Sequence, residues 1–131
     1  KDLPMLIHAI PLAPYALLAL RIITAIVFFS SGRSHVEKPE ERGKQIDMPP
    51  ATTRFLGIME VIAAISIAFG IFTQIGALII MVVMLGAMQR KIFDWKTGFY
   101  ADKGYGWHYD LIFFIAVAVI FSTGGGRFVL L

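Results

Sequence analysis

Four long apolar runs constrain what this chain can fold into more than any other feature of its sequence. A helix needs roughly 20 residues, with a range of about 17 to 25, to cross the hydrocarbon core of a bilayer. The composition agrees, because 57% of the residues are hydrophobic, 16% are charged and the mean hydropathy is +0.73. We therefore predict an all-α protein of one membrane domain over residues 1–131, a four-transmembrane-helix bundle with spans at 14–31, 55–72, 73–91 and 107–124.

The second and third spans follow each other closely. The sequence Gly70-Ile71-Phe72-Thr73-Gln74 separates them with a glycine and polar residues, as in a tight helical hairpin. The alternative is a bundle of three spans and one long buried helix.

Basic residues gather in two loops, 32–54 and 90–108, which hold nine of the twelve Lys and Arg residues. An excess of basic residues marks the cytoplasmic side of a membrane. We therefore predict that both loops are cytoplasmic in a bacterial inner membrane. The formal net charge of +3 is small and the cations do not stripe a helix, so we predict no nucleic-acid partner. The chain begins at Lys1 without an initiator Met, so we expect a further segment before it.

Ionisable residues inside the predicted spans are candidates for a buried polar cluster. Arg21 lies near the middle of the first span, where a charge costs at least about 2.5 kcal/mol and usually faces a partner. We expect Glu60 to pair with Arg21, with Asp110 and Gln89 near the same level. The cluster has two possible roles: a proton or quinone site, or an ion-pair network that fixes the register of the helices.

The loop at 90–108 interleaves large aromatic residues with glycines and charges. Trp and Tyr favour the headgroup layer, so we predict an ordered loop that lies along the membrane surface. Lipid headgroups, a partner subunit or a quinone ring would each cover such a surface. Candidate contacts for a quinone or a pigment are His35, Trp95, Trp107 and His108.

No cysteine is present, which excludes disulfides, thiolate metal sites and dithiol redox chemistry. We predict no metal site, because His108 and Asp110 stand two residues apart and diverge by about 200° on a helix. Because the chain has no cysteine and no other obvious redox group, we predict that electrons come from a partner protein. We therefore name no catalytic residue.

Several segments together resemble the DoxX family of small four-helix membrane proteins. They are "ALRIITAIVFFSSGRSHVEKP", "LGIMEVIAAISIAFGIFTQIGAL", "MLGAMQRKIF", "WKTGFYADKGYGWHYDLIFF" and "TGGGRF". The resemblance implies a membrane subunit associated with oxidoreductases, including a thiosulfate:quinone oxidoreductase, and with soluble redox partners. It carries over Arg21, Glu60, His108 and Asp110 as matched polar positions.

The resemblance leads us to expect a subunit of a larger quinone-linked electron-transfer complex in the membrane, in an accessory or quinone-handling role. Its cofactors would be non-covalent: a quinone, a lipid or a pigment at the bundle surface. Its partners would be membrane lipids and the other subunits. The alternative is a purely structural subunit that packs against a respiratory or photosynthetic complex and holds lipid or pigment. A small-solute carrier is a weaker reading, because no span is broken.

Overall fold

The computed structural model describes residues 7–100 and 106–131. This part of the chain contains helices and no strand, which confirms the all-α class. Five α-helices follow a short 3₁₀ turn, η1 (Ile10–Leu12), and a π-helical turn, η2 (Arg90–Asp94), continues the fourth. The α-helices are α1 (Ala13–Glu37), α2 (Pro39–Gln45), α3 (Pro50–Phe69), α4 (Thr73–Gln89) and α5 (Trp107–Thr123).

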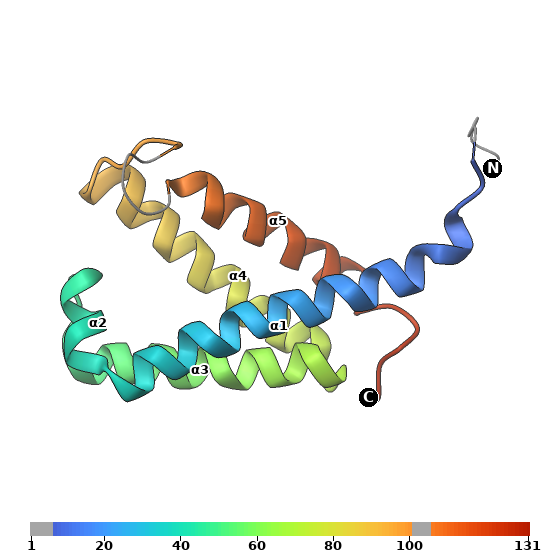
Figure 1. Ribbon diagram of the computed structural model, residues 1–131, viewed down its shortest axis with the longest axis horizontal. Coiled ribbons are helices and arrows are strands. Elements are labelled where there is room, and N and C mark those ends of the chain that lie inside the picture. Colours follow the sequence, from blue (N-terminus) through green and yellow to red (C-terminus); the bar gives the residue numbers. More distant parts are fainter. Residues whose placement is uncertain (1–6, 101–105) are drawn as a thin grey trace.

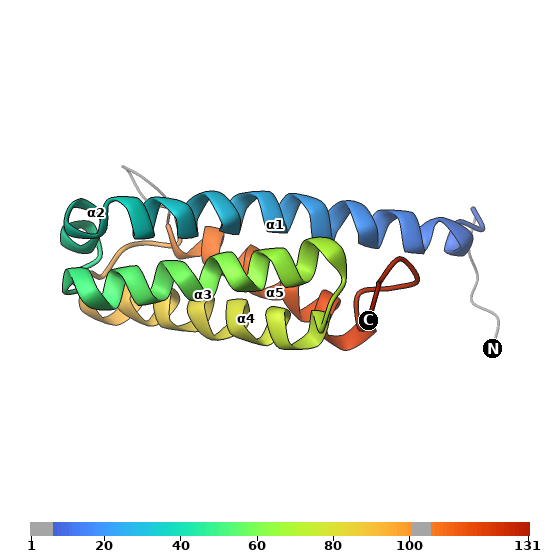
Figure 2. The same cartoon turned by 90° about the horizontal axis from the view of Figure 1, so that it is seen from below.

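The four long helices form two pairs. Helix α1 packs along α3, and α4 packs along α5, while α3 and α4 join the pairs through the hairpin between them (Figures 1 and 2). The two pairs diverge away from that hairpin, and the short α2 lies at the wide end (Figure 1). The wide end therefore brings together α2, η2 and the start of α5.

Three of the helical segments have the length and composition to cross a membrane: Ile10–Glu37, Pro50–Phe69 and Thr73–Asp94. Helix α5 has 17 residues, which is the lower limit of the range for a span. Large apolar side chains also cover the outward faces of the helices, where a soluble protein would carry polar groups. Examples of these exposed residues are Ile26, Ile62, Val82 and Ile115.

The predicted hairpin at 70–74 is confirmed. Gly70 ends α3 in the left-handed conformation, with φ of 71°, and its N–H donates to the carbonyl of Ser66. The hydroxyl of Ser66 then donates to the carbonyl of Phe72 at 3.0 Å. A glycine at this position lets the chain reverse without steric cost.

Three helix ends differ from the ends of the predicted spans. Helix α1 continues to Glu37 instead of ending at residue 31, because only Pro39 stops it by disfavouring helical geometry at Lys38. Helix α3 begins at Pro50, since proline suits the first turn of a helix, and it ends before residue 72 at the Gly70 cap. The predicted loop 32–54 therefore consists largely of helix and contains α2.

Two glycines let α1 and α3 cross at very short range. A Cβ atom on Gly32 would lie 2.6 Å from the carbonyl oxygen of Gly57, and one on Gly57 would lie 2.5 Å from that of Gly32. Small residues allow helix backbones in membranes to approach in this way. The core next to the crossing also uses small side chains, with Ala25, Ala63 and Ala64 fully buried or nearly so.

The segment after α5 folds back onto the hairpin. Gly124, Gly125 and Gly126 all have positive φ, and Gly124 caps the C-terminal end of α5. The backbone N–H groups of Leu130 and Leu131 both donate to the carbonyl of Gly70 at 3.0 Å. This segment is thus attached to the end of the bundle opposite α2.

Candidate functional site

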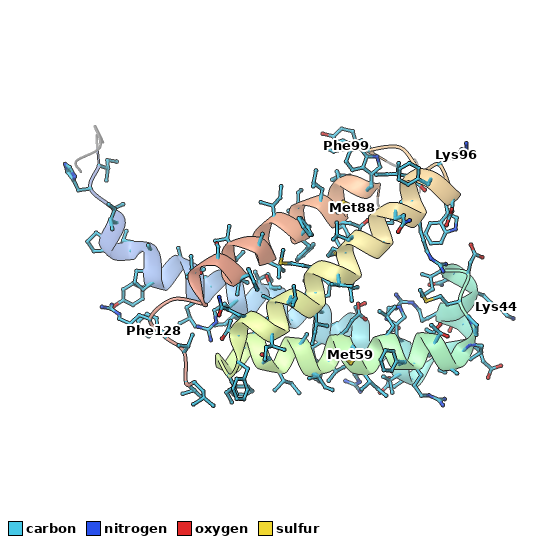
Figure 3. The ribbon with its side chains drawn as sticks, turned by 180° about the vertical axis from the view of Figure 1, so that it is seen from behind. Lys44, Met59, Met88, Lys96, Phe99 and Phe128 are labelled. Atoms are coloured by element: carbon cyan, nitrogen blue, oxygen red, sulfur yellow. The ribbon has the colours of Figure 1, made fainter. Side chains whose placement is uncertain are left out.

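A cavity of about 670 Å³ lies at the wide end of the bundle, between the two helix pairs. All five α-helices and η2 contribute to its lining, which is mostly apolar. Figure 3 shows Met59, one of the lining residues, on α3, with Lys44 of α2 and Lys96 after η2 at the wide end. Volumes of roughly 300–1,000 Å³ are typical of sites for small molecules and cofactors.

His35 and Glu60 form a buried pair in the wall of this cavity. Nδ1 of His35 lies 2.9 Å from Oε1 of Glu60, and the two residues are 5% and 3% exposed. The hydroxyl of Ser31 lies 3.3 Å from the same carboxylate oxygen. The crossing of Gly32 over Gly57 sets this geometry. His35 lies three residues after Gly32 on α1 and Glu60 lies three residues after Gly57 on α3, about one turn along each helix.

A second ionic pair closes the opposite wall. Nζ of Lys91, in η2, lies 2.9 Å from Oδ2 of Asp110, in the first turn of α5. Lys91 also lies 5.8 Å from the ring centroid of Tyr109, within range of a cation–π contact. Both pairs line the cavity, so it presents a few polar groups on an otherwise apolar surface.

Hydrogen bonds between the segment after α2 and η2 cross the wide end of the cavity. Nε1 of Trp95 donates to Oδ2 of Asp47 at 2.7 Å. Nη1 of Arg90 donates to the carbonyls of Ile46 and Asp47. We call these four residues the α2–η2 bridge. It places Trp95, a predicted contact residue, in the cavity lining.

Arg21 does not pair with Glu60, and that prediction was wrong. Arg21 is 1% exposed, and it donates to the carbonyls of Ile67 at 2.9 Å, Ala68 at 3.2 Å, Gly125 at 3.4 Å and Phe128. We call these four acceptors the carbonyl clamp. No carboxylate lies within salt-bridge distance of Arg21 among residues 7–100 and 106–131.

The antiparallel run of α1 and α3 explains this result. Arg21 lies eleven residues before Gly32, and Ala68 lies eleven residues after Gly57, so the two positions face each other. Glu60 is eight residues before Ala68, or about 12 Å along α3. Arginine at that level meets the C-terminal end of α3 instead, where unpaired carbonyls and the helix dipole favour a cation.

The other predicted site residues separate into two places. His35, Glu60, Asp110 and Trp95 line the cavity. Gln89 is exposed and does not line the cavity, because its position on α4 faces away from the bundle. The prediction that it belongs to the buried cluster was therefore wrong.

His108 and Trp107 also lie outside the cavity lining, in an aromatic cluster with Phe99 and Tyr100. The ring centroids of Phe99 and Trp107 are 4.7 Å apart, and those of Tyr100 and His108 are 4.9 Å apart. Nδ1 of His108 lies 2.6 Å from the carbonyl oxygen of Phe99. This described part of the loop is ordered by these contacts, whereas residues 101–105 of the predicted aromatic loop lie outside the described residues.

Sequence reasoning missed Ser31, Lys91 and the glycine crossing. Lys91 was counted only as a loop cation, and no sequence spacing links it to Asp110. Gly32 and Gly57 did carry a usable signal, because a small residue in each of two neighbouring helices is typical of a close crossing.

Comparison with known proteins gives one match. The family model described as DoxX matches residues 16–95, a range that runs from α1 through η2 and includes Arg21, His35, Glu60 and Lys91. Asp110 and the rest of α5 lie beyond the matched range. No curated protein and no solved structure matches the chain.

Proposed function

The chain belongs to the DoxX family and is an integral membrane protein, and from this premise we propose that it handles quinone as an accessory subunit of a larger redox complex in the membrane. In this proposal all four long helices span a bacterial inner membrane. The wide end of the bundle, with the loops 32–54 and 90–108, lies on the cytoplasmic side, as the basic residues of these loops favour.

The observation that carries the proposal is the cavity that brings His35 and Glu60 to one apolar space with Trp95 and Tyr109. A quinone ring is flat and apolar, with an oxygen at each end that accepts hydrogen bonds. Aromatic and methionine side chains suit the ring, and a histidine suits an oxygen. The imidazole of a buried histidine–carboxylate pair can also donate a proton and then take up another.

Reduction of a quinone to a quinol takes up two electrons and two protons. His35 can donate one of these protons to a quinone oxygen, and Glu60 holds the imidazole ring in place. Lys91, paired with Asp110 on the opposite wall, can donate a hydrogen bond and then the second proton to the other oxygen. The electrons come from a partner redox protein, since the chain contributes no cysteine for thiol redox chemistry.

Tryptophan fluorescence tests this proposal directly, because the chain has only two tryptophans. In a Trp107→Phe variant, Trp95 is the single reporter and lies in the cavity lining. Titration of the protein in lipid nanodiscs with a quinone should quench Trp95 saturably. The matched control is Trp95→Phe, in which Trp107 reports from outside the cavity and should show only weak, linear quenching. Equal linear quenching in both variants contradicts the proposal.

A purely structural subunit is the second candidate, favoured by the aromatic cluster outside the cavity. Tyr100 is 76% exposed in that cluster, although large aromatic side chains are usually covered. In this case Trp107→Ala would release partner subunits during native purification, and the quinone titration would show no saturation.

A further inference from the structure

The lining of the cavity is exposed on one side only. Every lining residue contributed by α1, α2, η2 and α5 is buried or half-buried, as are the two from the segment after α2. The exposed lining residues all belong to α3 and α4: Thr52, Phe55, Leu78, Val82 and Gly86. The cavity therefore opens sideways between α3 and α4, and this is the face that contacts lipid when the helices span a bilayer.

The end of the cavity near α2 is more closed. The α2–η2 bridge joins the two helix pairs there, with Trp95 donating to Asp47 at 2.7 Å and Arg90 donating to two carbonyls. A ligand that came from the water would have to break these bonds. Entry through the side opening breaks none of these hydrogen bonds. Four of its five residues, all except Thr52, have no polar side-chain group.

Gly86 faces open space at the side opening. A Cβ atom at Gly86 would meet nothing within 4 Å, in contrast to the crowded glycines at the α1–α3 crossing. Glycine in the interior of a helix lowers stability relative to alanine by about 0.5–1 kcal/mol, so packing does not account for its presence here. Free space beside an apolar opening is suited to a flexible hydrocarbon chain.

We propose that the ligand is a quinone with a long lipophilic tail, and that the tail leaves the cavity between α3 and α4 past Gly86 and Val82. This inference rests on the proposed function and specifies its substrate class. The ring lies beside His35 and Glu60, and the tail extends into the bilayer. The ligand enters and leaves through the same opening, so it does not pass through water.

The test compares two quinones that share a ring: one has no tail and the other has a ten-carbon tail. Affinities are measured by Trp95 quenching in the Trp107→Phe background. The tailed quinone should bind the unblocked protein more tightly. Gly86→Phe fills the opening and should weaken binding of the tailed quinone by at least about tenfold, because the tail then has no way out of the cavity. Binding of the tail-less quinone should change by less than about twofold.

Leu85→Phe is the matched control, because Leu85 is exposed on the same helix but does not line the cavity. It should leave both affinities unchanged. Val82→Phe blocks the opening one turn away and should repeat the selective loss, which covers the case in which Gly86→Phe folds poorly. Equal effects on both quinones, or no effect on either, would overturn the side exit while leaving the quinone site intact. If the unblocked protein binds neither quinone saturably, the proposed function itself fails, and this inference fails with it.

Discussion

Replacement of Arg21 by leucine should destabilise the bundle strongly. The N–H groups four residues after Ile67 and Ala68 lie beyond the end of α3 and donate elsewhere: that of Ile71 to Ser66 and that of Phe72 to Leu131. Leucine at position 21 therefore leaves the carbonyls of Ile67 and Ala68 without a partner. Each unsatisfied buried carbonyl costs about 1–3 kcal/mol.

We expect a net loss of about 3 kcal/mol, because water entering near the hairpin relieves part of the cost of the two carbonyls. This loss raises the equilibrium constant of unfolding about 10²-fold. Unfolding is measured by circular dichroism as the fraction of sodium dodecyl sulfate in mixed micelles increases. The matched control is Arg33→Leu on the same helix, which removes a solvent-exposed pair with Glu37 and should leave the stability nearly unchanged, because solvent screens such pairs.

A double variant separates the carbonyl clamp from an ion pair with Glu60. Arg21 and Glu60 act at levels about 12 Å apart along α3, so the costs of Arg21→Leu and Glu60→Gln should add within about 0.5 kcal/mol. A recovery of stability in the double variant would show that the two charges interact. A loss below about 1 kcal/mol for Arg21→Leu alone would also refute the reasoning, because one unsatisfied carbonyl already costs that much.

Three further outcomes follow from the geometry. Gly57→Ala should lower the stability by about 1–3 kcal/mol by overpacking the α1–α3 crossing, and it should also weaken quinone binding. Gly86→Ala should leave the stability unchanged or raise it slightly, so equal stabilities of the two variants would contradict the crossing. Single cysteines at Lys44 and Lys96 should both resist an impermeant thiol reagent in intact cells and both react after lysis, and labelling of only one would contradict their shared end (Figure 3). His35→Phe should abolish saturable quenching of Trp95 while His108→Phe preserves it, and the reverse result would move the site to the aromatic cluster.

The sequence allowed the helical class and the hairpin to be predicted because both depend on local signals. Apolar runs of sufficient length predict helices in a membrane, and Gly70 with polar neighbours predicts a turn. The end of α1 was misplaced because polarity and helicity do not end together. The helix leaves the predicted apolar span after Ser31 but continues to Glu37, two residues before Pro39.

The site was predicted only in part, because depth in the membrane does not determine which residues meet. Glu60 and Asp110 were recognised as unusual charges, and both line the cavity. His35, the partner of Glu60, depends on the helix crossing, whose glycine signal was not used. Lys91, the partner of Asp110, depends on the position of η2, which no spacing in the sequence reveals. Arg21 was assigned a carboxylate partner because backbone carbonyls, present at every residue, leave no signal in a sequence.

The carbonyl clamp also makes the first helix depend on residues that are synthesised much later. Arg21 enters the membrane with α1, but two of its acceptors, Gly125 and Phe128, are made more than a hundred residues later. Until then the guanidinium bears part of the insertion cost of about 2.5–3.5 kcal/mol for a charge in a span. Nascent α1 is therefore only weakly held in the bilayer, and docking of the segment after α5 secures it. A chain interrupted before Gly125 would leave the Arg21 guanidinium inside the membrane without two of its four carbonyl acceptors.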